Sequence, residues 1–209
     1  MNNTIRAYFN RMAAVWDENI AEKDAVKLKR MARRLNIKPR SRVLDIGTGT
    51  GVFLPFILAQ VGQSGGIVAM DIAGEMLAKA RAKGFDGDIA YLLADATGIP
   101  LGDGIFDAVV CYSSFPHFQD KPGALAEIYR VIKSGGKLVI CHTSGRATIN
   151  EIHTDIPSVA HDTIPERSQM QAILTEAGFG EIKIADRRTS YLVSARKAWR
   201  KTTTAQTQG

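Results

Sequence analysis

The sequence predicts an α/β protein built on one mostly parallel sheet with helices on both faces. Short apolar runs alternate with helical patterns over residues 42–177, and this alternation is typical of β-α-β units. A glycine-rich turn at 47–51 follows the first apolar run directly. Two final apolar runs, 181–187 and 190–196, are separated by a short turn and can form a hairpin that adds an antiparallel strand.

The individual elements follow from apolar periodicity and from turn residues. Residues 1–38 are expected to be helical, and Pro39 ends this region. We expect strands over 42–46, 66–70, 89–94, 106–112 and 137–141, and helices over 52–61, 74–83, 122–133 and 169–177. Residues 142–166 break this rhythm and are expected to be an irregular insert. The predicted organisation is a helical cap (1–38), a main domain (39–198) with a lid insert (142–166), and a flexible tail (199–209).

Composition limits the class of protein. At 209 residues the chain is long enough for one domain, and its hydrophobic content of 45% suffices for a core. The sequence contains no run of about eighteen apolar residues, so we expect no membrane span. The N-terminus lacks the apolar core of a signal peptide. We therefore expect a cytoplasmic protein. Cys111 and Cys141 lie in apolar runs, so buried thiols are expected in that reducing compartment.

The net charge of +6 raises the alternative of a nucleic-acid partner. The positive charge concentrates in residues 23–42 and 196–201. The first segment alternates basic and apolar residues, as the exposed face of an amphipathic helix does. Neither segment is interleaved with the aromatic residues that stack on bases. A solvated surface is therefore the favoured interpretation of both segments.

The most informative motif is VLDIGTGTG at residues 43–51, an apolar strand that runs into three glycines and then a helix. Glycine permits tight turns and close approach of a ligand, and the helix presents free N–H groups at its start. Dinucleotide folds usually show G-x-G-x-x-G for a pyrophosphate, whereas the spacing here is G-x-G-x-G with Asp45 before it. A carboxylate there would repel a pyrophosphate but attract the ammonium or sulfonium group of S-adenosylmethionine (SAM).

Two further acids end the next two predicted strands. Asp71 follows the second strand about twenty residues past the glycines, where an acid can accept hydrogen bonds from ribose hydroxyls. Asp95 follows the third strand, from which it could reach the amine of an adenine. Each acid alone is typical of a helix cap or a turn. Three acids at successive strand ends instead indicate a ligand site at the carboxyl edge of the sheet.

These motifs resemble those of class I SAM-dependent methyltransferases, of the methyltransferase type 11 group that includes ubiquinone/menaquinone-biosynthesis methyltransferases. The resemblance covers roughly residues 9–196 and rests on the segments 43–51, 68–71 with 75–77, 94–100, 106–118 and 127–140. It implies a Rossmann-like three-layer α/β/α sandwich whose seven-stranded sheet has the order 3-2-1-4-5-7-6, with strand 7 antiparallel. It also implies SAM as the cofactor.

The same resemblance implies the cofactor contacts. The glycine turn would meet the methionyl group, the acid after the second strand would hold the ribose, and the acid after the third would read the adenine. The residues so assigned are Asp45, Gly47, Thr48, Gly49 and Gly51 in the turn, Asp71, Ile72 and Met76 after the second strand, Asp95 and Ala96 after the third, and Tyr112 and Ser113 at the end of the fourth.

The acceptor side is less well specified. Tyr8 and Trp16 resemble parts of a cap helix that closes over SAM, although core packing explains them equally well. Such enzymes often read Leu-His-His-Leu after the fourth strand, and this chain reads Phe-Pro-His-Phe at 115–118. Arg146, in the insert, could clamp an acidic group of the substrate. His153, in the same insert, is a further substrate-binding candidate.

All four histidines follow the fourth strand, in segments expected near the transferred methyl group. In one hypothesis His117 or His142 is a general base, because SAM already carries an activated methyl and only proton removal is needed. In a second, less favoured hypothesis, His142 and His153, with His161 or Asp155, bind a metal, although their spacing matches no standard site. In a third, the histidines only line a substrate lid.

The sequence therefore favours a SAM-dependent methyltransferase that acts on a small-molecule acceptor. The alternatives are a nucleic-acid methyltransferase and a non-catalytic SAM-binding protein, whereas the glycine spacing disfavours an NAD-dependent oxidoreductase. The sequence does not determine the oligomeric state, and a homodimer is one assembly that it allows. The identity of the acceptor is also undetermined, since specificity in such folds lies in variable segments around the conserved chemistry.

Overall fold

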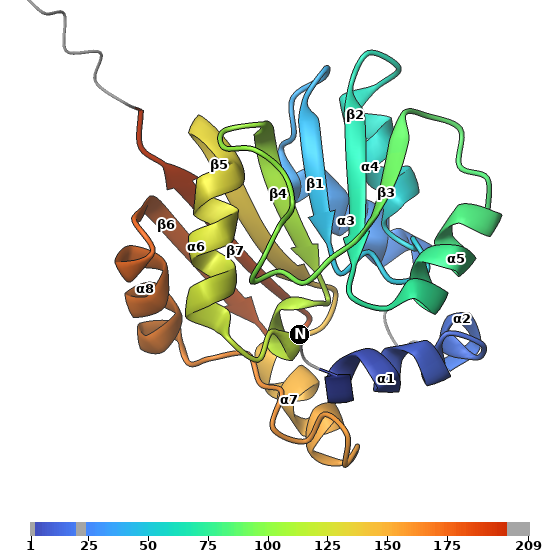
Figure 1. Ribbon diagram of the computed structural model, residues 1–209. Helices are drawn as coiled ribbons and strands as arrows, with labels where there is room; N and C mark the ends of the chain where they lie inside the picture. The colour runs from blue at the N-terminus through green and yellow to red at the C-terminus, as the bar shows by residue number, and fades with distance from the viewer. Residues whose placement is uncertain (1–2, 20–23, 200–209) are drawn as a thin grey trace, which may run out of the picture.

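The computed structural model describes residues 3–19 and 24–199, which form one sheet with helices around it (Figure 1). Its strands are β1 (Arg42–Ile46), β2 (Gly66–Asp71), β3 (Ile89–Leu93), β4 (Phe106–Tyr112), β5 (Ile132–His142), β6 (Phe179–Arg187) and β7 (Ser190–Lys197). Their spatial order is β3-β2-β1-β4-β5-β7-β6, and β7 runs antiparallel to both of its neighbours. The predicted sheet order and the antiparallel strand are therefore confirmed.

The helices cover both faces of the sheet and its carboxyl edge. They are α1 (Asn3–Met12), α2 (Trp16–Asn19), α3 (Ala25–Leu35), α4 (Leu54–Val61), α5 (Gly74–Ala82), the 3-10 turn η1 (Phe115–His117), α6 (Lys121–Val131), α7 (Arg146–Thr154) and α8 (Arg167–Glu176). Figure 1 shows α6 and α8 in front of the sheet and α3 and α4 behind it. Helices α1, α2 and α7 lie below the carboxyl ends of the parallel strands.

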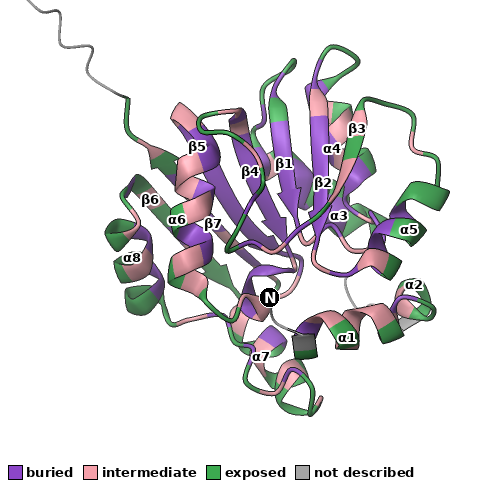
Figure 2. Ribbon diagram, viewed as in Figure 1, coloured by how far each residue is buried: buried purple, intermediate pink, exposed green. Residues whose placement is uncertain are grey.

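Two apolar cores lie on opposite faces of the sheet, because successive side chains of a strand point to opposite sides. In β1, Leu44 packs toward α6 and α8, whereas Val43 packs toward α3 and α4. The central strands are buried on both faces (Figure 2), as their continuous apolar runs predicted. Cys111 and Cys141 are buried free thiols that belong to different cores.

The structure corrects three of the predicted boundaries. The helical region expected over 1–38 divides into separate helices, and α3 packs into the core instead of joining a cap. The insert, expected to be irregular, contains α7. Strand β5 begins at Ile132, earlier than predicted, because residues 134–136 continue the strand despite two glycines. Its pairing with β4 shifts in register between Phe106 and Ala108, and this irregularity accommodates the glycine segment.

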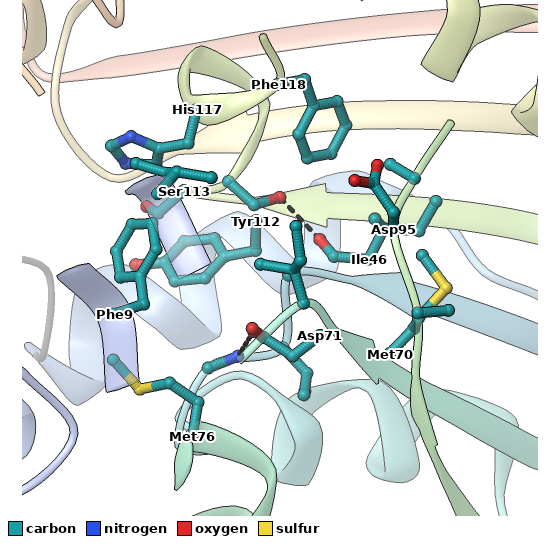
Figure 3. Close-up of a pocket in the computed structure, with 18 of the residues that line it drawn as sticks. Phe9, Ile46, Met70, Asp71, Met76, Asp95, Tyr112, Ser113, His117 and Phe118 are labelled. Atoms are coloured by element: carbon teal, nitrogen blue, oxygen red, sulfur yellow. Dashed lines mark hydrogen bonds between the residues drawn. The ribbon is translucent and has the colours of Figure 1, made fainter. Parts of the chain in front are cut away.

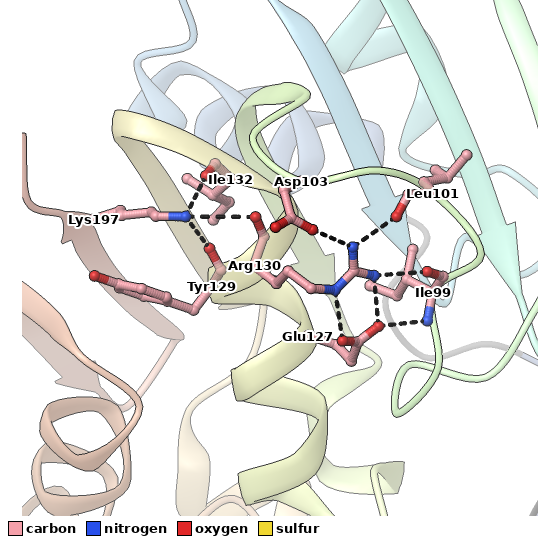
Figure 4. Close-up of polar contacts among 8 residues, drawn as sticks. All are labelled: Ile99, Leu101, Asp103, Glu127, Tyr129, Arg130, Ile132 and Lys197. Carbon is pink, nitrogen blue, oxygen red and sulfur yellow. Dashed lines mark hydrogen bonds and ion pairs between the residues drawn. The ribbon is translucent and has the colours of Figure 1, made fainter. Parts of the chain in front are cut away.

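A cluster of charged side chains fixes the loop that enters the site after β3 (Figure 4). Arg130 of α6 donates to both oxygens of Glu127, to Asp103, and to the carbonyl oxygens of Ile99 and Leu101, at 2.7–2.8 Å. Glu127 in turn accepts from the backbone N–H of Ile99 at 2.9 Å. Such charge-assisted bonds are among the stronger polar contacts in proteins. They hold residues 99–103 against α6.

The sequence predicted an amphipathic basic helix near the N-terminus and no membrane span. Helix α3 is amphipathic as predicted, with Leu28, Met31 and Leu35 buried and Lys27 and Lys29 exposed. Among the described residues, no helix has both the length and the apolar character needed to cross a bilayer. The tail predicted at 199–209 lies outside the described residues, apart from Trp199.

Candidate functional site

A cavity of ≈ 280 Å³ opens at the carboxyl edge of the sheet, where the ends of β1, β2, β3 and β4 meet α1, α2 and η1 (Figure 3). This is the edge at which open α/β sheets bind ligands. The volume is close to the lower end of the range for small-molecule sites. The walls of this cavity come from segments that are far apart in the chain.

The glycine turn forms one wall, and its first glycine has a steric reason to be there. Gly47 has a φ of +72°, and a Cβ at this position would lie 2.3 Å from the Cβ of Ser114. The hydroxyl of Ser114 donates to the carbonyl oxygen of Ile46 at 2.6 Å, so the turn and the end of β4 are locked together. Only glycine fits this close approach without displacing Ser114.

Asp71 joins the glycine turn to the end of β2. Its carboxylate accepts hydrogen bonds from the backbone N–H groups of Gly49 and Ala73, each at 2.8 Å, and it lines the cavity while only 6% exposed. Burial raises the pKa of Asp71 to about 6, although these backbone bonds act in the opposite direction. A carboxylate with two bonded N–H groups keeps further lone pairs that can accept ligand hydroxyls.

Asp45 lies beneath the turn and does not line the cavity. It is 1% exposed, and its Oδ1 has no hydrogen-bond partner among the described residues. Its pKa is raised to about 7, mainly by burial and also by the nearby Asp71. Thr48 opposes this shift and lowers the pKa. A buried carboxylate in this state favours a cation nearby, because a positive charge would offset the desolvation of the ionised form.

The ends of β3 and β4 supply polar groups to the opposite wall. Asp95 lines the cavity, and its Oδ1 accepts from the backbone N–H and the hydroxyl of Thr97 at 3.0 and 2.9 Å. Ser113 lines the cavity with a φ of +53°, which is unusual for a residue other than glycine. Its hydroxyl is buried and has no hydrogen-bond partner among the described residues. Ser113 thus combines backbone strain with an unpaired buried hydroxyl, two features that are often found at functional sites.

Helices α1 and α2 close the cavity from below. Phe9 and Trp16 line it, with ring centroids 5.6 Å apart in an edge-to-face contact. Asp17 accepts a hydrogen bond from the hydroxyl of Thr50 in the glycine turn, and it pairs with Lys83 at 2.7 Å. These two contacts attach α2 to the turn after β1 and to the end of α5. Helices α1 and α2 therefore form a cover, which we call the N-terminal cover.

His117 of η1 reaches the cavity beside Phe9, with the ring centroids 5.0 Å apart (Figure 3). Its Nδ1 lies 2.8 Å from Oδ2 of Asp162, whose Oδ1 accepts from the Gln119 side chain at 2.7 Å. Asp162 is 5% exposed and follows α7 in the insert. The insert thus supplies a buried carboxylate behind the cavity histidine.

Most of the predicted residues come together on the cavity wall, and some do not. Those that line it are Gly47, Thr48, Gly49, Asp71, Ile72, Met76, Asp95, Ala96, Tyr112, Ser113, Trp16 and His117. Those that do not line it are Asp45, Gly51, Tyr8, His142, Arg146 and His153.

Three of the residues away from the cavity have structural surroundings of their own. Arg146 pairs with Glu166 at 2.8 Å and with Asp186 at 3.0 Å, so it is engaged elsewhere. His142 is 1% exposed at the end of β5, inside the core. His153 contacts the carbonyl oxygen of Asp162 through its Nδ1. Of the two predicted bases, only His117 therefore reaches the cavity.

The metal hypothesis gains no geometric support. Among the described residues, no three His, Cys, Asp or Glu side chains are arranged so that they could hold a metal ion. His117 and His153 do lie close, with ring centroids 4.8 Å apart, but their Nδ1 atoms are directed to the side chain and backbone of Asp162.

Sequence reasoning missed three contributors to the site: Asp162, Ser114 and Asp17. Asp162 is 45 residues from His117, and an acid in an insert carries no local signal of its partner. Ser114 could have been suspected as the residue after the strand end at Ser113. Asp17 was visible only as a neighbour of Trp16, a residue predicted to belong to the cap.

Comparison with known proteins finds similarity to methyltransferases. Residues 44–140 match the family model described as methyltransferase domain. The chain is 41% identical over 107 residues to a demethylmenaquinone methyltransferase of Thermus thermophilus, covering 49% of this chain and 47% of that protein. It is 30% identical over 146 residues to the ubiquinone/menaquinone biosynthesis C-methyltransferase UbiE of Pectobacterium carotovorum, covering 68% and 57%. The chain thus spans about half the length of these relatives.

Solved structures share the fold. A SAM-dependent methyltransferase from Aquifex aeolicus aligns with a TM-score of 0.67 at 24% identity, covering 83% of this chain and 93% of that one. A methyltransferase from Haloferax volcanii, solved in complex with the Trm112 methyltransferase activator, aligns with a TM-score of 0.75 at 20% identity, covering 91% and 97%. At these identities the likeness concerns the fold.

Proposed function

We propose that this chain, which carries a methyltransferase domain at residues 44–140, is a SAM-dependent enzyme that methylates a small molecule. The observation that carries the proposal is the convergence of the strand-end acids and the glycine turn on one cavity. Asp71 and Asp95 line that cavity together with Gly47 and Gly49. Three short, separate sequence motifs thus meet around a space of the size that one small ligand needs.

The residues present fit SAM, which when bound supplies a methyl group on a positively charged sulfur. Asp71 would hold the ribose hydroxyls, and Asp95 with the backbone of Ala96 would read the adenine. The space above Gly49 is open, since a Cβ there would meet only the Trp16 ring nitrogen, at 3.9 Å, and the ligand can approach this backbone closely. The buried charge of Asp45 favours a cationic ligand over a pyrophosphate.

The acceptor is proposed to be a small molecule of the quinone-precursor type. The relatives carry names from menaquinone and ubiquinone biosynthesis, and one of them is named a C-methyltransferase. The limited volume of the cavity supports a small acceptor, as does the cover that Phe9 and Trp16 of α1 and α2 place over it. The cytoplasm remains our expectation for its compartment.

The substitution Asp71→Ala tests the cofactor site. We expect SAM affinity to fall roughly 10- to 100-fold, because hydrogen bonds to a charged group contribute about 1.5–3 kcal/mol. Isothermal titration calorimetry measures the affinity, and Asp86→Ala, which removes an exposed acid near α5, is the matched control.

Asp71 also holds the backbone of Gly49 and Ala73, so a thermal melt must accompany the titration. Asp71→Asn preserves the shape and one acceptor oxygen, and it should lose less affinity than the alanine variant. Unchanged SAM affinity in a folded Asp71→Ala protein would remove this assignment. Failure of the unmodified chain to bind SAM would remove the proposed function itself.

A further inference from the structure

We propose that His117 takes the proton from the methyl acceptor and that Asp162 positions His117 for this step. This inference rests on the proposed function, whose quinone-precursor acceptor carries ring hydroxyls, and it adds to that function a catalytic residue and a positioning residue. It starts from one contact, the 2.8 Å hydrogen bond between His117 Nδ1 and Asp162 Oδ2.

The contact fixes which ring nitrogen faces the acceptor. Nδ1 is directed to Asp162, behind the cavity, and His117 itself lines the cavity. Among the described residues, Nε2 has no hydrogen-bond partner in the structure. An imidazole whose Nδ1–H is bound by a carboxylate presents the lone pair of Nε2, which is the arrangement of a general base.

The electrostatics of the two partners agree on one protonation state. Burial lowers the pKa of His117, and this effect exceeds the opposing influence of Asp162. Burial would raise the pKa of Asp162, but the hydrogen bonds from His117 and Gln119 exceed it and lower that pKa. Both directions describe a neutral imidazole that donates to an ionised carboxylate. Near neutral pH, His117 is therefore able to accept a proton.

Neighbouring side chains hold both the His117 ring and the turn that carries it. The Lys121 ammonium donates to the carbonyl oxygens of Pro116 and Phe118 at 2.9 and 3.0 Å, so η1 is tied to α6. Phe9 meets the His117 ring edge-to-face from the N-terminal cover. His153 of α7 packs against the same ring and contacts the backbone oxygen of Asp162. A base held this firmly needs little reorganisation when the acceptor binds.

The groups that set the pKa of His117 come from several elements. Asp162 raises it, whereas His153 of α7 and His142 of β5 lower it. Lys121 of α6 lowers the pKa of Asp162. Asp162 in turn raises the pKa of Tyr8 of α1. The single carboxylate in contact with His117 is thus opposed by two histidines and by burial, and the neutral form is kept available.

The cavity walls select the acceptor. Aromatic side chains of Phe9, Trp16 and Phe118 line it, and among the described residues no lysine or arginine does. An anionic acceptor would find no counter-charge there, whereas a flat apolar ring would find matching walls. A phenolic hydroxyl, with an ordinary pKa of about 10, is also far closer to an imidazole than water at about 15.7. The walls and the base thus both favour a hydroxylated aromatic ring.

In the transfer step, the methylated atom of the acceptor gives an electron pair to the methyl carbon. This atom is the ring oxygen or a ring carbon that the oxygen makes electron-rich. The bond from the methyl carbon to sulfur breaks, and its electron pair stays on the sulfur. The acceptor's proton passes to Nε2 of His117, and the resulting imidazolium is stabilised by the Asp162 carboxylate until it returns the proton to water.

The test uses the full chain, methyl-labelled SAM, and two probes, 1,4-naphthalenediol and phenol, over pH 5.5–10. His117→Asn keeps an N–H donor toward Asp162 but removes the base. We expect its transfer rate at pH 7 to fall roughly 10²- to 10⁴-fold, with SAM affinity within twofold of wild type. The deficit should shrink toward pH 10, where the probe ionises by itself. A merely structural role for His117 would not produce this recovery.

Asp162→Asn tests the positioning role. Removing the carboxylate should lower the transfer rate about 10-fold and move the midpoint of the pH–rate profile to lower pH, because Asp162 raises the pKa of His117. His161→Asn is the matched control, since His161 is exposed and adjacent to Asp162 in the chain. It should match wild type in both rate and pH midpoint.

Each outcome decides a separate claim. Absence of SAM binding in wild type would overturn the proposed function. SAM binding without methylation of either probe would overturn the acceptor class. A His117→Asn rate within twofold of wild type at pH 7 would overturn the base, and an Asp162→Asn profile with an unmoved midpoint would overturn the positioning role.

Discussion

Two buried carboxylates beneath and beside the cavity, Asp45 and Asp71, make cofactor affinity depend on pH. Their pKa values are raised to about 7 and about 6, so both are partly protonated at mildly acidic pH. A cationic ligand prefers the ionised forms, and its binding must therefore release protons as these groups ionise. We expect SAM affinity to rise at least severalfold from pH 5.5 to pH 8.

Calorimetry at several pH values, in buffers of different ionisation enthalpy, measures both the affinity and the released protons. Without the ligand, the sign for stability is opposite. The folded state holds these protons between about pH 3.8 and 7 while the unfolded chain has lost them, so the free energy of unfolding falls as pH rises through this window. Asp45→Asn should remove the step near pH 7. An affinity that stays constant from pH 5.5 to 8 would contradict this account.

Also at the scale of residues, the sequence predicted those site residues whose geometry is set by neighbours in the chain. Asp71 and the glycines could be predicted because a strand, a turn and an acid at fixed spacing carry their own geometry. Asp162 could not be predicted, because its partner His117 is 45 residues away and the insert that joins them has no fixed pattern. His142 and His117 looked equivalent in sequence, and burial separates them: His142 is 1% exposed in the core, whereas His117 reaches the cavity.

At the scale of elements, the polar contacts that attach the N-terminal cover to the domain include an exposed ion pair. Asp17 and Lys83 form an ion pair at 2.7 Å. About half of the Asp17 side chain and about one third of the Lys83 side chain are exposed. Exposed pairs of this kind contribute about 0.2–1 kcal/mol. We expect Asp17→Lys, which places two ammonium groups together, to weaken SAM binding roughly two- to fivefold and to speed its release. Stopped-flow fluorescence of Trp16, which lines the cavity, can follow that release.

The charge-swapped double variant, Asp17→Lys with Lys83→Asp, is the control for this prediction. It restores an ion pair but not the hydrogen bond from Thr50, so recovery should be partial. If the single and double variants release SAM at the wild-type rate, the cover does not gate the cavity through this contact.

Elements with strong apolar periods were predictable, and weakly patterned ones were not. The β-α alternation and the closing hairpin followed directly from the sequence. Helix α7 was missed because Ile149 is the only buried residue that it contributes among those described, and one apolar position makes no period. The start of β5 was missed because glycines at 135 and 136 indicate a turn, whereas the register shift against β4 lets the strand continue through them.

At the scale of the whole molecule, the excess positive charge is displaced from the site. Helix α3 exposes Lys27, Lys29 and Arg30 on its outer face, and no residue of α3 lines the cavity. The cavity wall itself carries the acids Asp71 and Asp95. A nucleic-acid substrate would need its phosphates near basic groups that also border the reacting atoms. The distribution of charge therefore favours the small-molecule alternative over the nucleic-acid one.

A triple variant with Lys27, Lys29 and Arg30 each replaced by glutamine tests the role of this basic face. If the basic face only keeps the protein solvated, SAM affinity and methyl transfer should stay within twofold of wild type. Any binding of the wild type to RNA or DNA should be weak at physiological salt, in the non-specific range of about 10⁻⁴–10⁻⁶ M. If the face instead holds a nucleic-acid substrate, binding should be tight. The plot of log affinity against log salt should then be shallower for the variant, by an amount that corresponds to the loss of up to about three phosphate contacts. Fluorescence anisotropy with labelled RNA and DNA at three salt concentrations separates the two outcomes. Tight binding that the triple variant loses would reverse the choice of a small-molecule acceptor.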